Sequence, residues 1–130
     1  FTAENIREHA LMQYGDEKYW GYSEEEALNY FLNNLEKIPI KIEAITIRPH
    51  PSDYKDKYLW TLNNKLVTAI SYGKTLIQDI SESDIIVGCE SMAMIVALAV
   101  GKKVISCIPP KGKRCSLPHN EIINFADLIH

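Results

Sequence analysis

The chain has 130 residues, of which 46% are hydrophobic and 24% charged, and its formal net charge is −3. This length suits one domain with a hydrophobic core, and the acidic balance provides no overall attraction to nucleic acid or to an anionic membrane. The three cysteines show no C-x-x-C spacing, which argues against a disulfide framework or a zinc site and fits a reducing cytoplasm. The longest apolar run, 92–100, is far shorter than the roughly 20 residues that a membrane span requires.

The first residues predict the end of a strand followed by a polar loop, because the aromatic Phe1 precedes the stretch 2–5. Two interpretations fit this start, namely a strand that belongs to a longer chain or an ordinary terminus. An aromatic and glycine-rich stretch, 14–22, has no clean period and predicts an ordered loop. Its aromatic side chains are suited to packing against neighbouring helices or, alternatively, to stacking on a base or sugar.

A capping box begins the first predicted helix, with Ser23 at the N-cap and Glu26 three residues later. Apolar residues then repeat at helical spacing until Pro39 ends the pattern.

A strand is predicted at 42–47, and it runs into the sequence R-P-H-P-S-D at 48–53. Prolines on both sides of His50 restrict its backbone, which suits a side chain held at a fixed place beyond a strand end. Ser52 or Asp53 is predicted to cap the next helix. The apolar stripe of that helix would comprise Tyr54, Tyr58, Leu59 and Leu62.

Residues 66–70 predict another strand, followed by the turn 71–74 and a short helix. The inward-facing residues of that helix would be Leu76, Ile77 and Ile80.

The strongest pattern comprises a strand at 84–87 closed by Gly88, an apolar helix at 92–100 and a strand at 104–108. Two strands joined by a helical crossover lie parallel, and helices cover both faces of such a sheet. We therefore expect the helix 92–100 to be nearly buried. The sequence predicts an α/β fold, a parallel sheet with helices on both faces, in a single domain over residues 1–130.

A basic loop follows the last of these strands, with Lys111, Lys113 and Arg114 after two prolines. We expect it to be either permanently solvated or ordered by an anionic ligand or a domain interface. A final helix is predicted with an apolar side made of Ile122, Ile123, Phe125, Ala126 and Ile129.

Polar, glycine-containing or basic turns follow every predicted strand, including 2–5 if a strand precedes them, and such turns open on one edge of a parallel sheet. Positive charge from Arg48, His50 and the basic loop, together with the helix start at Ser91, predicts an anionic ligand at this edge. Taken alone, Ser91 is better explained as a helix N-cap. If their strands are adjacent, His50 and Ser91 should converge on one phosphate group.

The stretches R-P-H-P-S-D and D-I-I-V-G-C-E-S-M-A-M-I-V-A-L-A-V-G-K-K-V-I-S resemble the C-terminal half of GT-B glycosyltransferases. The similarity is closest to bacterial sialyltransferases and polysialyltransferases, with their HP motif and serine motif. It implies a Rossmann-like domain in which His50 and Ser91 hold the phosphate of a CMP-activated sugar. The paired Ser-Ser or Ser-Thr of the family is here Glu90-Ser91, and a glutamate at this turn is more similar to GT-B enzymes that hold ribose hydroxyls of UDP- or GDP-sugars.

The nucleotide-binding residues implied in this way are Arg48, His50, Pro51, Ser52, Gly88, Glu90 and Ser91, with Lys111, Lys113 and Arg114 as an anion-binding loop.

The resemblance implies the donor-binding half of a glycosyltransferase for cell-surface polysaccharide, with a nucleotide sugar as substrate and no metal or other cofactor. The acceptor glycan and the general base would belong to an N-terminal domain that this chain lacks, so the chain alone is expected to be inactive. The expected location is the cytoplasm, with peripheral attachment to the inner membrane face as an option for the full-length protein. A nucleotide-sugar epimerase or hydrolase of the same architecture and a non-catalytic Rossmann-like interaction module are the alternatives.

Overall fold

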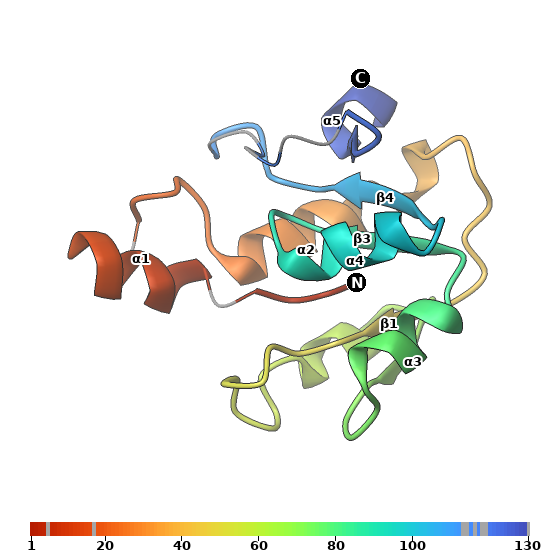
Figure 1. Ribbon diagram of the computed structural model, residues 1–130, viewed down its shortest axis with the longest axis horizontal. Coiled ribbons are helices and arrows are strands. Elements are labelled where there is room, and N and C mark those ends of the chain that lie inside the picture. Colours follow the sequence, from red (N-terminus) through yellow and green to blue (C-terminus); the bar gives the residue numbers. More distant parts are fainter. Residues whose placement is uncertain (5, 17, 113–114, 116, 118–119, 130) are drawn as a thin grey trace.

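The computed structural model describes residues 1–4, 6–16, 18–112, 115, 117 and 120–129 and has an α/β architecture (Figure 1). All strand pairs are parallel. One sheet holds β1 (Ile45–Ile47) and β2 (Val67–Ile70), and the other holds β3 (Ile85–Gly88), β4 (Lys103–Ser106) and β5 (Ile123–Asn124). The helices are α1 (Ile6–Tyr14), α2 (Glu24–Asn33), α3 (Leu76–Ser81), α4 (Met92–Ala99) and α5 (Phe125–Ile129), with 3-10 turns η1 (Leu35–Lys37) and η2 (Leu59–Asn63).

The first three residues lie between the two sheets and form hydrogen bonds to both. On the β1 side, the Ala3 amide donates to the Arg48 carbonyl and the Arg48 amide donates to the Phe1 carbonyl, both at 2.8 Å. On the β3 side, the Thr2 amide donates to the Val87 carbonyl at 2.8 Å. The N-terminal segment therefore takes the position of a strand between β1 and β3 (Figure 1).

The strand order is thus β2, β1, the N-terminal segment, β3, β4, β5. If the N-terminal segment is counted as strand 1 and β1 to β5 as strands 2 to 6, this is the 3-2-1-4-5-6 order of doubly wound, Rossmann-like sheets. In such sheets a ligand binds beyond the carboxyl ends of the strands at the point where the order reverses, here between the N-terminal segment and β3.

Helices cover both faces of the sheet, as predicted. In β3 and β4, Ile86 and Val104 pack with α3 and α4, whereas Val87 and Ile105 pack in the larger cluster that contains α2. Successive strand residues point to opposite faces, so a strand buried on both faces is apolar throughout. The predicted α/β fold with a parallel sheet is confirmed, with the N-terminal segment joining two short ladders.

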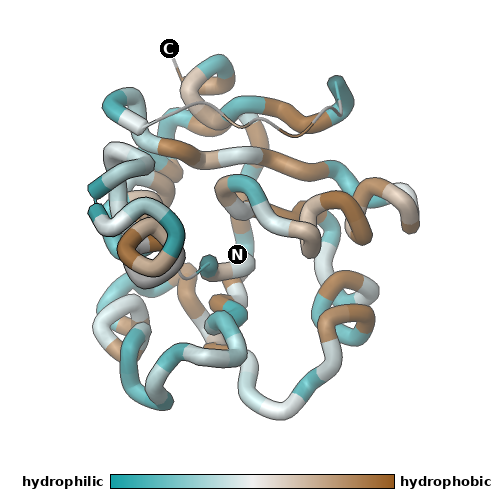
Figure 2. The backbone as a smooth tube through the Cα atoms, turned by 60° about the vertical axis from the view of Figure 1, so that its left-hand side comes forward, coloured by the Kyte–Doolittle hydropathy of each residue, from teal (hydrophilic) through white to brown (hydrophobic). Residues whose placement is uncertain are grey.

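Helix α4 is more exposed than the sequence predicts. Met94 and Ala97 are fully buried, but Met92 is 70% and Val100 is 54% exposed. Only the side of α4 that faces β3 and β4 is covered, and Figure 2 shows this hydrophobic helix at the edge of the molecule. The prediction of a nearly buried helix is therefore wrong for its two ends.

The predicted helix after residue 53 is also wrong, because this stretch forms turns and the 3-10 helix η2. Tyr58 is buried, whereas Tyr54, Leu59 and Leu62 are exposed. Asp53 does not cap a helix, since its carboxylate binds the backbone of the preceding turn. Local spacing suggested an apolar stripe that the tertiary structure does not bury.

The other helices show one agreement with the predictions and three smaller differences. The capping bond predicted for α2 is present, with the Glu26 amide donating to Ser23 Oγ at 3.2 Å. In α3, Ile80 is buried but Ile77 is exposed. Helix α1 had no prediction, and the last predicted helix begins later, because Ile123 pairs with β4 as part of strand β5.

Candidate functional site

A cavity of about 870 Å³ lies at the point where the strand order reverses. The end of the N-terminal segment, α1, the loop before α2, the turns after β1 and β3 and the start of α4 all contribute to its lining. Six of the seven nucleotide-binding residues predicted from the sequence line it, namely Arg48, His50, Pro51, Ser52, Glu90 and Ser91. We call residues 48–53 the HP turn and residues 88–91 the serine turn.

Gly88 is the predicted residue that does not line the cavity. A Cβ at this position would lie 2.8 Å from Thr2 Oγ1 and 3.2 Å from Met94 Sδ. Glycine therefore allows the N-terminal segment and α4 to approach the end of β3 closely.

The shared-phosphate prediction assumed that the strands before the two turns are adjacent. In the structure they are not. The N-terminal segment separates β1 from β3, because it forms hydrogen bonds to both. His50 and Ser91 still line one cavity. The inserted segment places Glu4 in the same cavity. The sequence patterns placed the stretch 2–5 at this edge of the sheet but did not single out Glu4.

Hydrogen bonds within the HP turn fix the orientation of the His50 imidazole. The His50 amide donates to Asp53 Oδ2 at 2.9 Å, and the Ser52 amide donates to His50 Nδ1 at 3.1 Å. Because Nδ1 accepts this bond, the proton of the neutral ring lies on Nε2. Nε2 has no hydrogen-bond partner among the residues that the structure describes, so the ring has one N–H donor left for a ligand.

A buried charge cluster supports the HP turn. Lys57 Nζ lies 2.8 Å from both Asp53 Oδ1 and Glu24 Oε1, and the three side chains are at most 9% exposed. Burial opposes the charge of Lys57, but its hydrogen bonds to Asp53 and Glu24 outweigh this effect and raise its pKa. The cluster thus connects α2 to the backbone of His50 without lining the cavity.

The serine turn is supported from within the cavity. Glu4 Oε1 accepts hydrogen bonds from the Cys89 amide at 3.0 Å and the Glu90 amide at 2.7 Å, and Glu4 lines the cavity. Burial raises the pKa of Glu4 from 4.5 to about 7, the Glu90 carboxylate adds to this shift, and the two amide bonds oppose it. A carboxyl group of the chain therefore occupies the backbone donors at the end of β3.

Ser91 and Met94 have the reciprocal arrangement of a capping box at the start of α4, and the Ser91 amide donates to Met94 Sδ at 3.4 Å, but the Ser91 hydroxyl makes no hydrogen bond to the helix. The Met94 amide donates to the Ser91 carbonyl at 3.1 Å instead. The hydroxyl oxygen is buried and has no hydrogen-bond partner within the described part of the chain. Buried polar atoms are normally paired, so an unpaired hydroxyl in a residue that lines a cavity is a candidate ligand group.

Two of the positive side chains that the sequence predicted for this site, Arg48 and Lys111, form ion pairs with acidic side chains. Arg48 Nη1 lies 2.7 Å from Asp79 Oδ2 and donates to the Lys74 carbonyl at 2.9 Å. Lys111 forms an exposed ion pair with Glu26 of α2 and is not part of the cavity lining. Lys113 and Arg114 lie outside the described residues.

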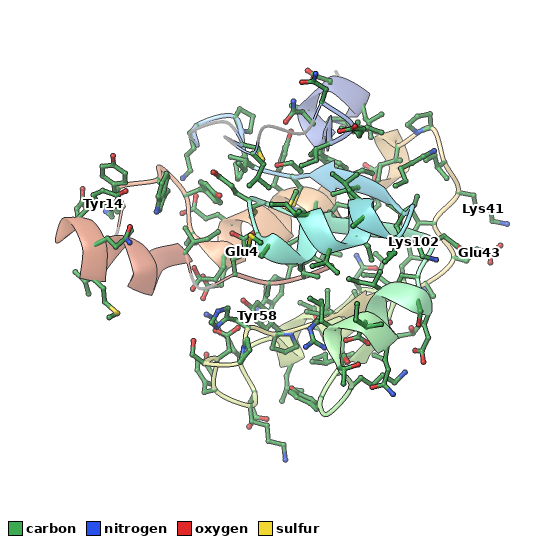
Figure 3. All side chains as sticks on the ribbon, in the orientation of Figure 1. Glu4, Tyr14, Lys41, Glu43, Tyr58 and Lys102 are labelled. Atoms are coloured by element: carbon green, nitrogen blue, oxygen red, sulfur yellow. The ribbon has the colours of Figure 1, made fainter. Side chains whose placement is uncertain are left out.

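Aromatic side chains form another part of the lining. Tyr14, Trp20 and Tyr22 line the cavity. The rings of Tyr14 and Tyr19 stack with their centroids 3.7 Å apart, and Tyr22 is buried. In Figure 3, Tyr14 lies on the outer part of α1, whereas Glu4 lies close to the start of α4. The stretch 14–22 therefore packs on itself and also faces the cavity.

Fold and cavity together define a Rossmann-like α/β protein with a candidate ligand site at the topological switch point. Comparisons of this chain with protein-family models, curated proteins and solved structures found no match. Among the described residues there is no group of three or more His, Cys, Asp and Glu side chains that could hold a metal ion. No described helix is long and apolar enough to cross a membrane.

Proposed function

We propose that this chain is the donor-binding domain of a glycosyltransferase, and that its cavity binds a nucleotide-activated sugar. A CMP-sugar is the favoured ligand, with UDP- and GDP-sugars as the alternatives, and the product would be cell-surface polysaccharide made on the cytoplasmic side. The proposal includes no metal or other cofactor. It places the acceptor glycan on another domain of the full-length protein.

The observation that carries the proposal is the meeting of the HP turn and the serine turn in one cavity at the switch point. These are the two stretches that resemble the HP and serine motifs of bacterial sialyltransferases. They lie in different parts of the sequence, and the cavity is of a size that accommodates a nucleotide-sized ligand. Their convergence supports a shared ligand more strongly than either motif does alone.

The groups on the two turns suit a phosphate of that ligand. His50 Nε2–H and the Ser91 hydroxyl are donors without a partner in the described structure. Backbone amides at the start of α4 add to the positive end of the helix dipole. Aromatic rings from the stretch 14–22 would contact the base or the sugar.

Calorimetric titration with CMP, UMP and GMP and with their nucleotide sugars tests this function. Losing one charge-assisted hydrogen bond costs about 1.5–3 kcal/mol, so His50→Ala should weaken nucleotide binding by roughly 10- to 150-fold. The control is Tyr54→Ala, because Tyr54 follows the same turn but is 70% exposed and does not line the cavity. Its affinity should equal that of the wild type.

Failure to bind any cytidine, uridine or guanosine nucleotide at millimolar concentration would contradict the proposal and favour the non-catalytic interaction module. An epimerase or hydrolase is tested separately, by incubating the full-length protein with the nucleotide sugar alone. Conversion of the donor sugar without an acceptor would favour that alternative.

A further inference from the structure

Glu4 lines the cavity but belongs to neither the HP turn nor the serine turn. It follows the N-terminal segment, whose place between β1 and β3 is fixed by backbone hydrogen bonds on both sides. The absence of a side chain at Gly88 leaves room for Thr2 to lie close to the end of β3. The carboxyl group therefore follows a segment that backbone hydrogen bonds attach to both sheets, at the point where ligands of this fold bind.

The two oxygens of this carboxyl group have different surroundings. Oε1 is saturated by the Cys89 and Glu90 amides, at 3.0 and 2.7 Å. Oε2 has no hydrogen-bond partner within the described residues. It is not among the atoms that are both unpaired and buried, so it is not fully covered by the protein. Since Glu4 lines the cavity, the remaining oxygen is accessible to a ligand while the first oxygen fixes the orientation of the group.

The chemistry of a carboxylate limits what this oxygen can bind. An ionised carboxylate only accepts hydrogen bonds, so it repels phosphate oxygens and pairs with hydroxyl or N–H donors. Glu90 places a second carboxyl group in the same lining, whereas His50 and Ser91 supply donors. The cavity thus contains an accepting part beside a donating part, which matches a ligand that carries both hydroxyls and a phosphate.

We infer that Glu4 is a specificity-determining residue that accepts a hydrogen bond from a hydroxyl group of the bound ligand, on either its ribose or its donor sugar. The inference deepens the proposed function and rests on it. It predicts that the ligand is a hydroxyl-rich phosphate ester and not an anion alone. Glu4 holds the serine turn with one oxygen and selects the ligand with the other.

The test uses Glu4→Gln, because the glutamine oxygen can still accept from the Cys89 and Glu90 amides while its amide group turns a donor toward the ligand. The matched control is Glu43→Gln, an exposed position outside the cavity. Affinities are measured by calorimetry for the mononucleotide, among CMP, UMP and GMP, that the wild type binds best, for its 2′,3′-dideoxy form and for its nucleotide sugar. Thermal melting verifies that each variant is folded.

If the ribose supplies the hydroxyl, Glu4→Gln should weaken binding of the mononucleotide by roughly 10- to 150-fold and leave binding of the dideoxy form unchanged. If the donor sugar supplies it, the loss should occur only with the nucleotide sugar. Either pattern supports the inference, because a purely structural role of Glu4 would reduce the affinity for every ligand equally.

An equal loss with all three ligands, an unchanged affinity or a gain in affinity would overturn the inference. The proposed function would survive these results if His50→Ala still weakened binding. Absence of nucleotide binding by the wild type would overturn both.

Discussion

The HP turn and the serine turn face the same cavity, but they are stabilised in opposite ways. The HP turn is held from outside the cavity by Asp53, whose charge is compensated by Lys57 in a buried cluster. The serine turn is held from inside the cavity by Glu4, whose charge has no cation within salt-bridge distance among the described residues. The Asp53–Lys57 support therefore stabilises the fold, whereas the buried charge of Glu4 costs stability, as is common at functional sites.

The difference indicates separate tasks for the two turns. The support of the HP turn is complete without a ligand, because all three charges of the cluster are close to oppositely charged partners. The support of the serine turn leaves an accessible carboxylate and a buried, unpaired Ser91 hydroxyl. We expect substitutions at the first support to change folding and substitutions at the second to change ligand binding more than folding.

The largest effect is expected when Lys57 is replaced by methionine. The change leaves Asp53 and Glu24 buried and close together without a cation, and breaking a buried ion pair in this way typically costs about 3–5 kcal/mol. The free energy of unfolding, measured by urea titration, should fall by about that amount. The control Lys74→Met removes an ion pair with Glu82 whose side chains are 51% and 57% exposed, and it should leave the urea midpoint nearly unchanged. A loss no larger than in the control would contradict the role of the cluster.

An intermediate effect of opposite sign is expected for Glu4→Gln. The pKa of Glu4 is raised from 4.5 to about 7, so the folded state binds this proton more tightly than the unfolded state. The wild type therefore loses stability as the pH rises from 4.5 to 7. Glutamine does not ionise, so at pH 8 the variant should be more stable by about 1–3 kcal/mol, with most of the gain gone at pH 5.

Urea titrations of wild type, Glu4→Gln and Glu43→Gln at both pH values check this prediction. Equal stability differences at the two pH values would show that Glu4 is not the titrating group. A lower stability of Glu4→Gln at pH 8 would show that its carboxylate supports the serine turn at no cost in charge burial.

A small gain is expected for Ser91→Ala. Loss of a helix cap costs about 1 kcal/mol, but the Ser91 hydroxyl makes no capping bond and is buried without a partner. Removing it relieves a desolvation cost, so stability should stay equal or rise by up to about 1 kcal/mol. Nucleotide affinity should fall in the same variant. A stability loss of about 1 kcal/mol, as is typical for a lost helix cap, would show that Ser91 acts as the N-cap of α4.

The smallest effect is expected for Lys111→Ala. Its ion pair with Glu26 is exposed on both sides, and such pairs contribute about 0–1 kcal/mol. Affinity for the nucleotide and its salt dependence should not change, because Lys111 does not line the cavity. A clear loss of affinity would show that the basic loop takes part in ligand binding.

Short-range patterns in the sequence were sufficient to predict the strands, the parallel sheet, the two turns and most of the helices, but not helix α1 or the turns that follow residue 53. Apolar runs indicate burial, and proline and glycine indicate where a strand must end, as at Pro49 and Gly88. Ser23 was predictable for the same reason, because a helix cap depends only on its own next three residues. These signals are local, so no knowledge of the neighbouring strands was needed.

Only the tertiary structure decided which segment lies beside which, and therefore what supports each turn. The bonds from Cys89 and Glu90 to Glu4 join residues 85 and 86 positions apart, and no local period reports such a pairing. The ion-pair cluster behind the HP turn is a second example, because Lys57 joins Asp53, which the sequence suggested only as a possible helix cap, to Glu24, 33 positions away from Lys57. A buried N–H donates to whichever acceptor the fold brings within reach. Which acceptor that is depends on the insertion of the N-terminal segment between β1 and β3 and on the packing of α2 against the HP turn.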